Sequence, residues 1–374
     1  MSLPGYQVNI IQTPPSPAEY IDIGTLFVAG KAATAGFGLV YSIDQFETTF
    51  GQRQATSPLY DGLQVFFREG GFRAYISAVA MAGVDADIVT AIDAFTPDLG
   101  PGSMAAFGLT TSTVQLALAN ACQNGGRIAL LDAADTPTAA TMVTAATAIT
   151  SQPGDHFSAM FAPWDSAPGL TGGAPSRIVP PSARVAGNLA RNDALGYSSG
   201  DPAAGVLGIA RYVQSLSQSA YSDADRQTLN EAGVNVSRVV LNGVRTYGWR
   251  TLANQTTDSD WTFLNGSRVI MAVKSALSVA AENFEFSKLD GLQKVTRKFQ
   301  GVLSGVLIGF WNSGDLFGDT SKEAFSVDTG PAVNTATTFA QGQLSANVGL
   351  RTSGMAEQVI INIAKVPITE SLAA

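Results

Sequence analysis

Apolar and polar positions follow a repeating order between residues 22 and 163, where short apolar runs are separated by amphipathic stretches. The runs have the length of strands, and the stretches repeat apolar residues three and four positions apart, as helices do. Helices that alternate with apolar strands indicate a parallel, doubly wound α/β sheet. Strands are expected at 23–30, 36–42, 72–80, 127–132 and 157–163, and helices at 42–51, 58–70, 88–95, 113–123 and 138–150.

The limits of the first two helices are marked by capping residues. Ser42 and Asp44 are N-cap candidates, because their side chains can accept from the free N–H groups of a first turn. Gly51 ends the first helix and the Gly70-Gly71 pair ends the second, since glycine accommodates the left-handed turn that closes a helix.

The middle of the chain interrupts this order. Residues 164–182 are rich in proline and glycine and predict a loop or a boundary. A helix is expected over 179–192, with Pro181 near its start. Residues 196–222 predict a loop with weak strand content.

The last third begins with a short capped helix at 222–232. Asn242-Gly243 then lies between apolar runs at 234–241 and 244–247, which is the strongest local signal for a β-hairpin in the chain. Further helices are expected within 261–283 and 289–312, and strands at 325–328, 343–350 and 357–363.

Both ends of the chain read as extended. Prolines at 4, 14, 15 and 17 prevent a helix, and partial alternation over 6–11 fits a strand that could pair with another sheet edge. A frayed terminus is the alternative. Residues 364–374 are expected to be an extended tail.

Composition favours an oligomer over a monomer. Hydrophobic residues make up 45% of the chain but charged residues only 14%, against about a quarter in ordinary soluble domains. A chain so poor in charge is expected to bury much of its surface against partners. A large core beneath a surface rich in serine and threonine is the alternative.

Charge and hydropathy exclude some partners. The net charge of −8 argues against direct contact with nucleic acid, because phosphate binding needs a basic face. The acidity lies in residues 1–233, with 10 Lys and Arg against 19 Asp and Glu, whereas residues 234–374 hold 12 against 11. No run of 18 apolar residues predicts membrane insertion, and the N-terminus lacks the pattern of a signal peptide.

The sequence offers little chemistry. His156, the one histidine, follows Asp155, but no G-x-S-x-G nucleophile elbow accompanies it, and a structural role is expected. Cys122, the one cysteine, excludes an intramolecular disulfide and is expected to be a small buried hydrophobe. No phosphate-binding glycine motif occurs, and Gly36-Phe37-Gly38 is interpreted as a turn. We therefore predict no catalytic, cofactor-binding or His/Cys metal site, while a carboxylate-only site for a divalent cation stays open.

One charged cluster stands out on the helix expected over 289–312. Positions 294 and 298 are one helical turn apart, 297 is adjacent, and the opposite face is apolar. A solvated helix face and a docking surface for an acidic partner both remain open. The cluster consists of Lys288, Lys294, Arg297 and Lys298.

Four stretches, in order along nearly the whole chain, resemble the contractile tail sheath family of phages, bacteriocin particles and related injection systems. The first is SIDQFETTFG with LYDGLQVFFREGGFRAYISAV, and the second is VPPSARVAGNLARND. The third is LNEAGVNVSRVVLNGVRTYGWRTLA, and the closing one runs from SRVIM through GVLIGFWNSGDLFGDTSKEAFSV to EQVIINI.

This resemblance implies a structural subunit, not an enzyme, with an outer α/β domain of subtilisin-like shape, a conserved C-terminal domain and two terminal arms. Terminal strands of neighbouring copies would pair with the sheet of the C-terminal domain. The implied limits are 1–20, 21–220, 221–357 and 358–374, and the implied arm residues are Tyr6, Val8, Ile10, Val359, Ile361 and Ile363.

The resemblance also implies the partners. These are other copies of the chain in a helical sheath, an inner tube protein that the basic helix would touch, and the baseplate and tail terminator proteins. The particle would be a virion tail or injection particle, assembled in the cytoplasm of the host bacterium. An α/β hydrolase or ligand-binding enzyme, and another structural subunit of the particle, are the alternatives.

Overall fold

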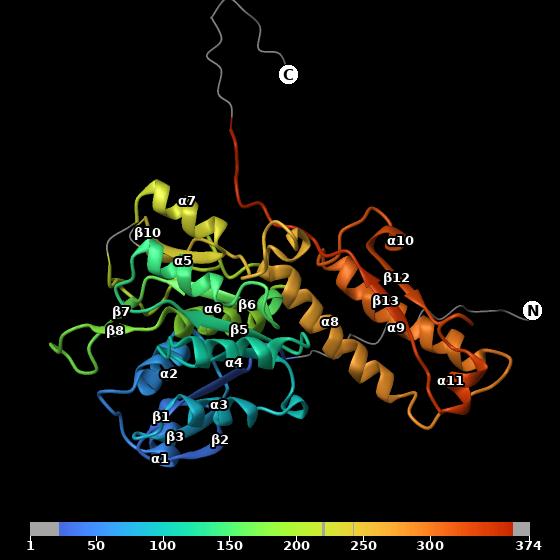
Figure 1. Ribbon diagram of the computed structural model, residues 1–374, viewed down its shortest axis with the longest axis horizontal. Helices are drawn as coiled ribbons and strands as arrows, with labels where there is room; N and C mark the ends of the chain where they lie inside the picture. Colours follow the sequence, from blue (N-terminus) through green and yellow to red (C-terminus); the bar gives the residue numbers. More distant parts are fainter. Residues whose placement is uncertain (1–21, 219–220, 242, 362–374) are drawn as a thin grey trace, which may run out of the picture.

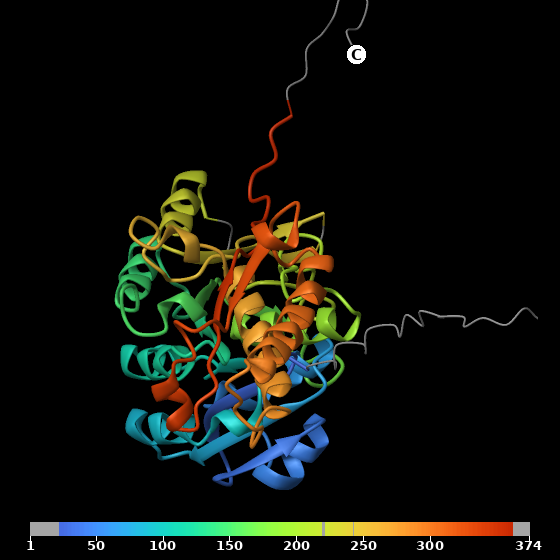
Figure 2. The same cartoon turned by 90° about the vertical axis from the view of Figure 1, so that its right-hand side faces the viewer.

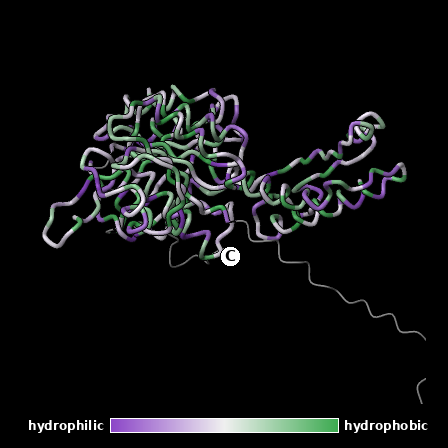
Figure 3. Tube along the Cα trace, turned by 90° about the horizontal axis from the view of Figure 1, so that it is seen from below, coloured by the Kyte–Doolittle hydropathy of each residue, from purple (hydrophilic) through white to green (hydrophobic). Residues whose placement is uncertain are grey.

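The computed structural model describes residues 22–218, 221–241 and 243–361, which form two units of unequal size. The larger unit surrounds an eight-stranded sheet, and the smaller one contains two long helices and a two-stranded sheet (Figure 1). Figure 3 shows the two bodies side by side from below. The expected N-terminal arm, with Tyr6, Val8 and Ile10, lies outside the described residues, and so does Ile363.

The large sheet has the strand order β11-β10-β6-β5-β4-β1-β3-β2. Its six inner strands are parallel, and β2 and β11 pair antiparallel at the two edges. The expectation of a parallel sheet holds for the inner strands, and β11 is antiparallel as part of the hairpin expected at Asn242-Gly243. At the other edge β2 departs from the parallel order, because the connection from β1 is too short for a crossover. The strands are β1 Leu26–Ala32, β2 Gly36–Val40, β3 Ala74–Ala80, β4 Gly102–Ala105, β5 Arg127–Asp132, β6 Ser158–Ala162, β10 Val234–Val240 and β11 Gly243–Thr246.

Helices cover both faces of this sheet, which confirms the doubly wound arrangement. One core lies under α1 (Ile43–Phe50), α2 (Pro58–Glu69) and α6 (Pro181–Ala194). The other core holds side chains from four helices, α3 (Asp85–Asp93), α4 (Ser112–Cys122), α5 (Ala139–Thr147) and α7 (Asp223–Glu231).

The expected caps of α1 and α2 are present. The Ser42 Oγ accepts a hydrogen bond from the Gln45 N–H at 3.3 Å. Gly51 and Gly70 close the two helices with φ of +89° and +117°, values that favour glycine.

Three short strands lie where the sequence indicated mainly loop. β7 (Asp165–Ala167), β8 (Arg177–Val179) and β9 (Ser215–Leu216) form a separate antiparallel sheet, and the turn between β7 and β8 projects from the body (Figure 1). The expectation of a loop over 164–182 is thus wrong at both ends. Strands of two or three residues are too short to show the alternation on which sequence analysis depends.

The smaller unit is built on α8 (Leu264–Glu282) and α9 (Lys294–Asn312), which pack along each other (Figure 2). β12 (Phe325–Asp328) and β13 (Asn347–Leu350) lie antiparallel beside them, as expected from the sequence. Two short helices complete the unit, α10 Ser321–Ala324 and α11 Ala336–Ala340.

Helix α8 belongs to both units. Leu264 and Met271 lie in the core of the large unit, whereas Leu277 and Ala281 pack on small apolar clusters of the second unit. One continuous helix therefore joins the two bodies.

Helix α7 and the hairpin β10–β11, which the sequence grouped with the C-terminal domain, belong to the large unit, because β10 pairs with β6. The Asn-Gly hairpin itself is confirmed. The division at residues 220 and 221 stays a prediction.

The end of the described chain differs from expectation. Residues 357–361, the described part of the strand expected over 357–363, have no strand partner among the described residues, and Val359 and Ile361 are each 77% exposed. Within the described residues, no helix has both the length and the apolar character needed to cross a membrane.

Candidate assembly surfaces

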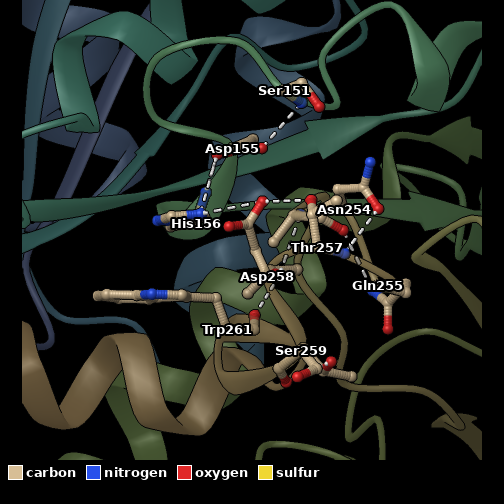
Figure 4. A network of polar contacts seen from close by, with 12 residues as sticks. Ser151, Asp155, His156, Asn254, Gln255, Thr257, Asp258, Ser259 and Trp261 are labelled. Carbon is tan, nitrogen blue, oxygen red and sulfur yellow. Dashed lines mark hydrogen bonds and ion pairs between the residues drawn. The ribbon is translucent and has the colours of Figure 1, made fainter.

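His156 is engaged in packing (Figure 4). Its ring stacks on Trp261 with 4.5 Å between ring centroids, and its Nε2 lies 3.7 Å from the Asp155 Oδ1 and 4.0 Å from the Asp258 Oδ2. Asp155 accepts the backbone N–H groups of Ser151 and His156, so this carboxylate holds the turn before β6. The contacts of His156 with Trp261 and Asp258 attach the loop 254–261 to the large unit. Among the described residues, no hydroxyl nucleophile is hydrogen-bonded to the imidazole ring.

Cys122 is fully buried, as expected. Burial raises the pKa of its thiol to about 12, so the group stays a neutral, unreactive side chain. In the described part of the chain, no group of three or more His, Cys, Asp or Glu residues could hold a metal ion.

The motif VPPSARVAGNLARND forms α6, and its polar side chains join it to the elements around it. The Asp132 carboxylate at the end of β5 accepts the N–H and Oγ–H of Ser182, at 2.8 and 2.7 Å, and the N–H of Gly108. Burial raises the pKa of Asp132 to about 6, although these hydrogen bonds oppose the shift.

Arg184, two residues further along α6, is completely buried and forms an ion pair with the buried Asp165 of β7 at 2.8 Å. Its other nitrogens donate to the hydroxyls of Thr246 and Ser237 in the hairpin β10–β11. A single guanidinium therefore links α6 with two sheets.

The last turns of α6 continue this pattern. Arg191 pairs with Glu69 of α2, and Asp193 pairs with Arg268 of α8 at 2.8 Å. A Cβ at Gly187 would lie 2.8 Å from the carbonyl oxygen of Phe66, so only glycine allows α2 to approach this closely. The sequence singled out the motif but did not predict these ion pairs.

The two-stranded sheet β12–β13 has free edges. Among the described residues no third strand pairs with it, so backbone N–H and C=O groups on its outer edges have no ladder partners. Beside β13 lies an apolar groove of about 390 Å³ between α8 and α9. Its lining includes Leu277, Leu303, Val348 and Leu350.

The basic cluster is exposed in the smaller unit. Lys294, Arg297 and Lys298 lie on the outer face of α9, and Lys288 lies in the loop before it. No ion pair within 4 Å holds any of the four in the described chain, and the Lys298 Nζ lies 5.8 Å from the centroid of the Phe284 ring. Helix α9 lies within the expected range 289–312 and begins at Lys294, because Gln293 has a φ of +60° and the Asp290 carboxylate accepts the first helical N–H groups.

The outer face of α9 continues as a row of glycines. Gly301, Gly305 and Gly309 follow at four-residue spacing, and a Cβ at any of them would meet nothing within 4 Å. Glycine within a helix costs about 0.5–1 kcal/mol relative to alanine. Nothing within the described chain requires glycine at these positions.

No protein-family model and no curated protein matches the chain. Solved structures do match, along the whole chain. The PVC sheath of an extracellular contractile injection system, in its contracted state, has a TM-score of 0.75 and 20% identity over 98% of this chain and 99% of that chain.

Two structures of the anti-feeding prophage agree with this. A chain of its contracted helical sheath has a TM-score of 0.72 and 22% identity, with coverage of 98% and 100%. A chain of its baseplate has a TM-score of 0.74 and 21% identity, with coverage of 98% and 99%. The resemblance recognised in the sequence is thus confirmed at the level of the fold, in both units and in their order.

Proposed function

We propose that this protein is the sheath subunit of a contractile tail or injection particle, which polymerises around an inner tube and contracts to drive it through a target envelope. The observation that carries the proposal is the match of the entire chain, both units together, to sheath proteins of contractile systems. The packed state of His156 and the structural use of the α6 motif agree with a non-enzymatic role.

Strand exchange between copies would link the sheath. β12 and β13 offer free edges, and the described end of the chain leaves Val359 and Ile361 exposed without a partner. Added strands would satisfy the edge N–H and C=O groups, while alternate apolar side chains would cover the groove beside β13. The occupants proposed are the terminal segments of neighbouring copies, with Tyr6, Val8 and Ile10 from one end and Val359, Ile361 and Ile363 from the other.

Helix α9 would face the inner tube. Its cations Lys294, Arg297 and Lys298, and Lys288 in the preceding loop, would pair with acidic groups of the tube. The glycine row would let the tube approach the helix closely. Exposed ion pairs contribute only about 0–1 kcal/mol each. Such contacts suit a surface that must separate when the sheath contracts.

The energy for contraction would be stored during assembly. Burying roughly 1,000 Å² of further apolar surface per subunit would supply about 25 kcal/mol before opposing terms, so no nucleotide is needed. Because α8 joins the two units, each subunit would move as one body, with the terminal strands as hinges. Baseplate and terminator proteins complete the proposed partners, and the site of assembly is the host cytoplasm.

Negative-stain microscopy of the purified protein tests the proposal. Wide, striated, hollow tubes are expected, either alone or after co-expression with the cognate tube protein. Only monomers or small closed rings under both conditions would contradict it.

A further inference from the structure

The side chain of Arg250, in the stretch YGWRTLA, makes an ion pair that the sequence analysis did not predict. Its Nε donates to the Glu357 Oε1 at 2.8 Å and its Nη2 to the Oε2 at 2.5 Å, which makes a two-pronged ion pair. The residues come from separate parts of the fold, since Arg250 follows β11 in the large unit and Glu357 follows β13 in the small one.

The surroundings fix the arginine in place. Its backbone N–H donates to the Asn235 Oδ1 at 2.6 Å, and its carbonyl accepts from the Asn235 Nδ2. The Nη1 donates to the carbonyl of Asn230 at 3.2 Å. With the side-chain amide of Asn230 oriented so that its oxygen accepts from the Arg250 Nη2, its nitrogen donates to the Glu357 Oε1 at 3.3 Å. The hydrogen bond from Arg250 lowers the pKa of Glu357, so the carboxylate stays charged.

Little else holds the chain at this point. Ser353 still bonds to Asp315 and Gly314, and Met355 packs on the large core. Between 354 and 361, the polar contacts found in the described chain are those of Glu357. The described residues beyond it, 358–361, extend away from both units (Figures 1 and 2).

The position of this ion pair determines what the following residues can reach. After Leu350 the chain leaves β13, and Glu357 is then held on the large unit, beside α7 and away from the β12–β13 sheet. To pair with its own sheet, the described residues 358–361 would have to turn back across the junction between the two units. The apolar groove beside β13 would accept its alternating side chains equally well from the same chain or from a second copy.

We propose that Arg250 is a positioning residue, which clamps Glu357 so that the C-terminal strand cannot fold back on its own β12–β13 sheet and pairs only with that of another copy. This inference rests on the proposed sheath function. The other end of the described chain has a similar arrangement, since Arg73 of the stretch FRAYISAV donates to the Asp22 carboxylate at 2.5 Å.

The test uses the full chain with spin labels on cysteines introduced by Lys322→Cys in α10 and Ile361→Cys, because the buried Cys122 does not react. Electron–electron resonance on dilute, unassembled protein measures the distance between the labels. The labelled protein with Arg250 and Glu357 intact is expected to give one population of long distances between positions 322 and 361. Arg250→Ala is expected to add a population of short distances, with the ratio of held to released chains lowered about fivefold, the effect of one partly buried ion pair.

Further variants separate the clamp from a loss of folding. Glu357→Gln alters only the exposed segment and is expected to release it as Arg250→Ala does. Arg250→Lys, which keeps the charge but not the two-pronged geometry, is expected to give an intermediate ratio. Arg226→Ala removes a neighbouring surface ion pair with Asp223 and is expected to leave the distances unchanged.

Polymer yield by microscopy then completes the test. Released variants are expected to assemble poorly, because self-paired chains occupy the sheets that neighbours need. Unchanged distances in both Arg250→Ala and Glu357→Gln overturn the clamp, and so does normal polymer yield from chains shown to be released. If the unmodified protein forms no polymer at all, the sheath function fails, while the label distances still decide whether the clamp exists.

Discussion

The polar side chains of α6 connect elements that lie far apart in the sequence. Asp132 and Ser182 are separated by 50 positions, Asp193 and Arg268 by 75, and Glu69 and Arg191 by 122. Each is buried, so a single truncation leaves an unpaired polar or charged group in the core, which costs about 3–5 kcal/mol for a charge. Residues that resemble a functional motif thus act by fixing the geometry of the large unit.

Asp132 makes the stability of the protein depend on pH. Its pKa rises from about 3.8 in the unfolded chain to about 6 in the folded one, so the folded state binds the proton more tightly. The free energy of unfolding is therefore expected to fall by about 2 kcal/mol as the pH rises from 4 to 6. Urea denaturation across this range measures the slope. Asp132→Asn, which cannot ionise, should flatten it, and an equally steep slope in the variant would assign the effect to other groups.

For single residues, the sequence predicts those roles that depend on residues a few positions away in the chain. The caps Ser42 and Gly51 and the burial of Cys122 follow from local pattern and are confirmed. The partner of Arg184 does not, because Asp165 becomes its neighbour only when β7 folds against α6. Nothing in the sequence around Arg184 or Asp165 indicates that these two residues, among all the acidic and basic residues of the chain, form a pair.

Helix α9 shows how a whole element presents two chemically different surfaces. Val295, Phe299 and Leu303 face inward, as the periodicity predicted, and the outer face carries first cations and then glycines. The inward face follows from the spacing of apolar residues. The role of the outer face does not, because solvent and a partner protein both tolerate the same residues.

Reversing the charge of the outer face tests its role. The triple variant Lys294→Glu, Arg297→Glu and Lys298→Glu is expected to lower co-assembly with the tube protein, because the introduced carboxylates would repel the acidic groups proposed on the tube. Spontaneous polymerisation of the sheath alone should persist. Co-sedimentation with tubes measures the yield, Lys322→Glu on α10 is the control, and an unchanged yield would count against the assignment to the tube.

The glycines of the same face allow the opposite test. Gly305→Ala is expected to raise the free energy of unfolding by about 0.5–1 kcal/mol and yet to lower assembly on the tube, since the added methyl group separates the two surfaces. Thermal denaturation and co-sedimentation measure the two effects. Ser304→Ala, on the adjacent side of α9, should leave assembly intact. Equal tube binding by the Gly305 variant would remove close approach as the reason for the glycine.

The sequence predicts long elements better than short ones. The strands β1, β3 and β5 and the helix α6 were placed within a few residues of their observed limits, because each has enough positions to show a period. β4 has four residues without a β-branched side chain, and β7 and β8 have three each, so they were missed. The strand expected over 357–363 has the right period but no partner within the described chain.

At the scale of the whole molecule, the two units differ in how complete they are. The large sheet has helices over both faces, whereas the small sheet β12–β13 has no further strand among the described residues and has an apolar groove beside it. The small sheet packs on the helices of its unit but has only two strands, so added strands would stabilise it further. We interpret the small unit as one that is completed by other copies.

Removing the terminal segments tests this interpretation. Deletion of residues 1–18, or of 362–374, is expected to leave folded, soluble monomers that form no long polymers, because either deletion removes a proposed partner strand. Size-exclusion chromatography and microscopy measure the outcome, and circular dichroism confirms that the core is intact. Normal polymers from both truncations would contradict the strand-exchange mechanism.

The sharing of α8 between the two units has a consequence for folding. Its first half completes the apolar core of the large unit through Leu264 and Met271, and its second half holds the clusters around Phe299 and Leu307. Unfolding of one unit would remove the support of one half of α8 and fray the end of the other half, so the stabilities of the two bodies are coupled. The two units are therefore expected to behave as one cooperative folding unit with a single calorimetric transition, despite their separate appearance.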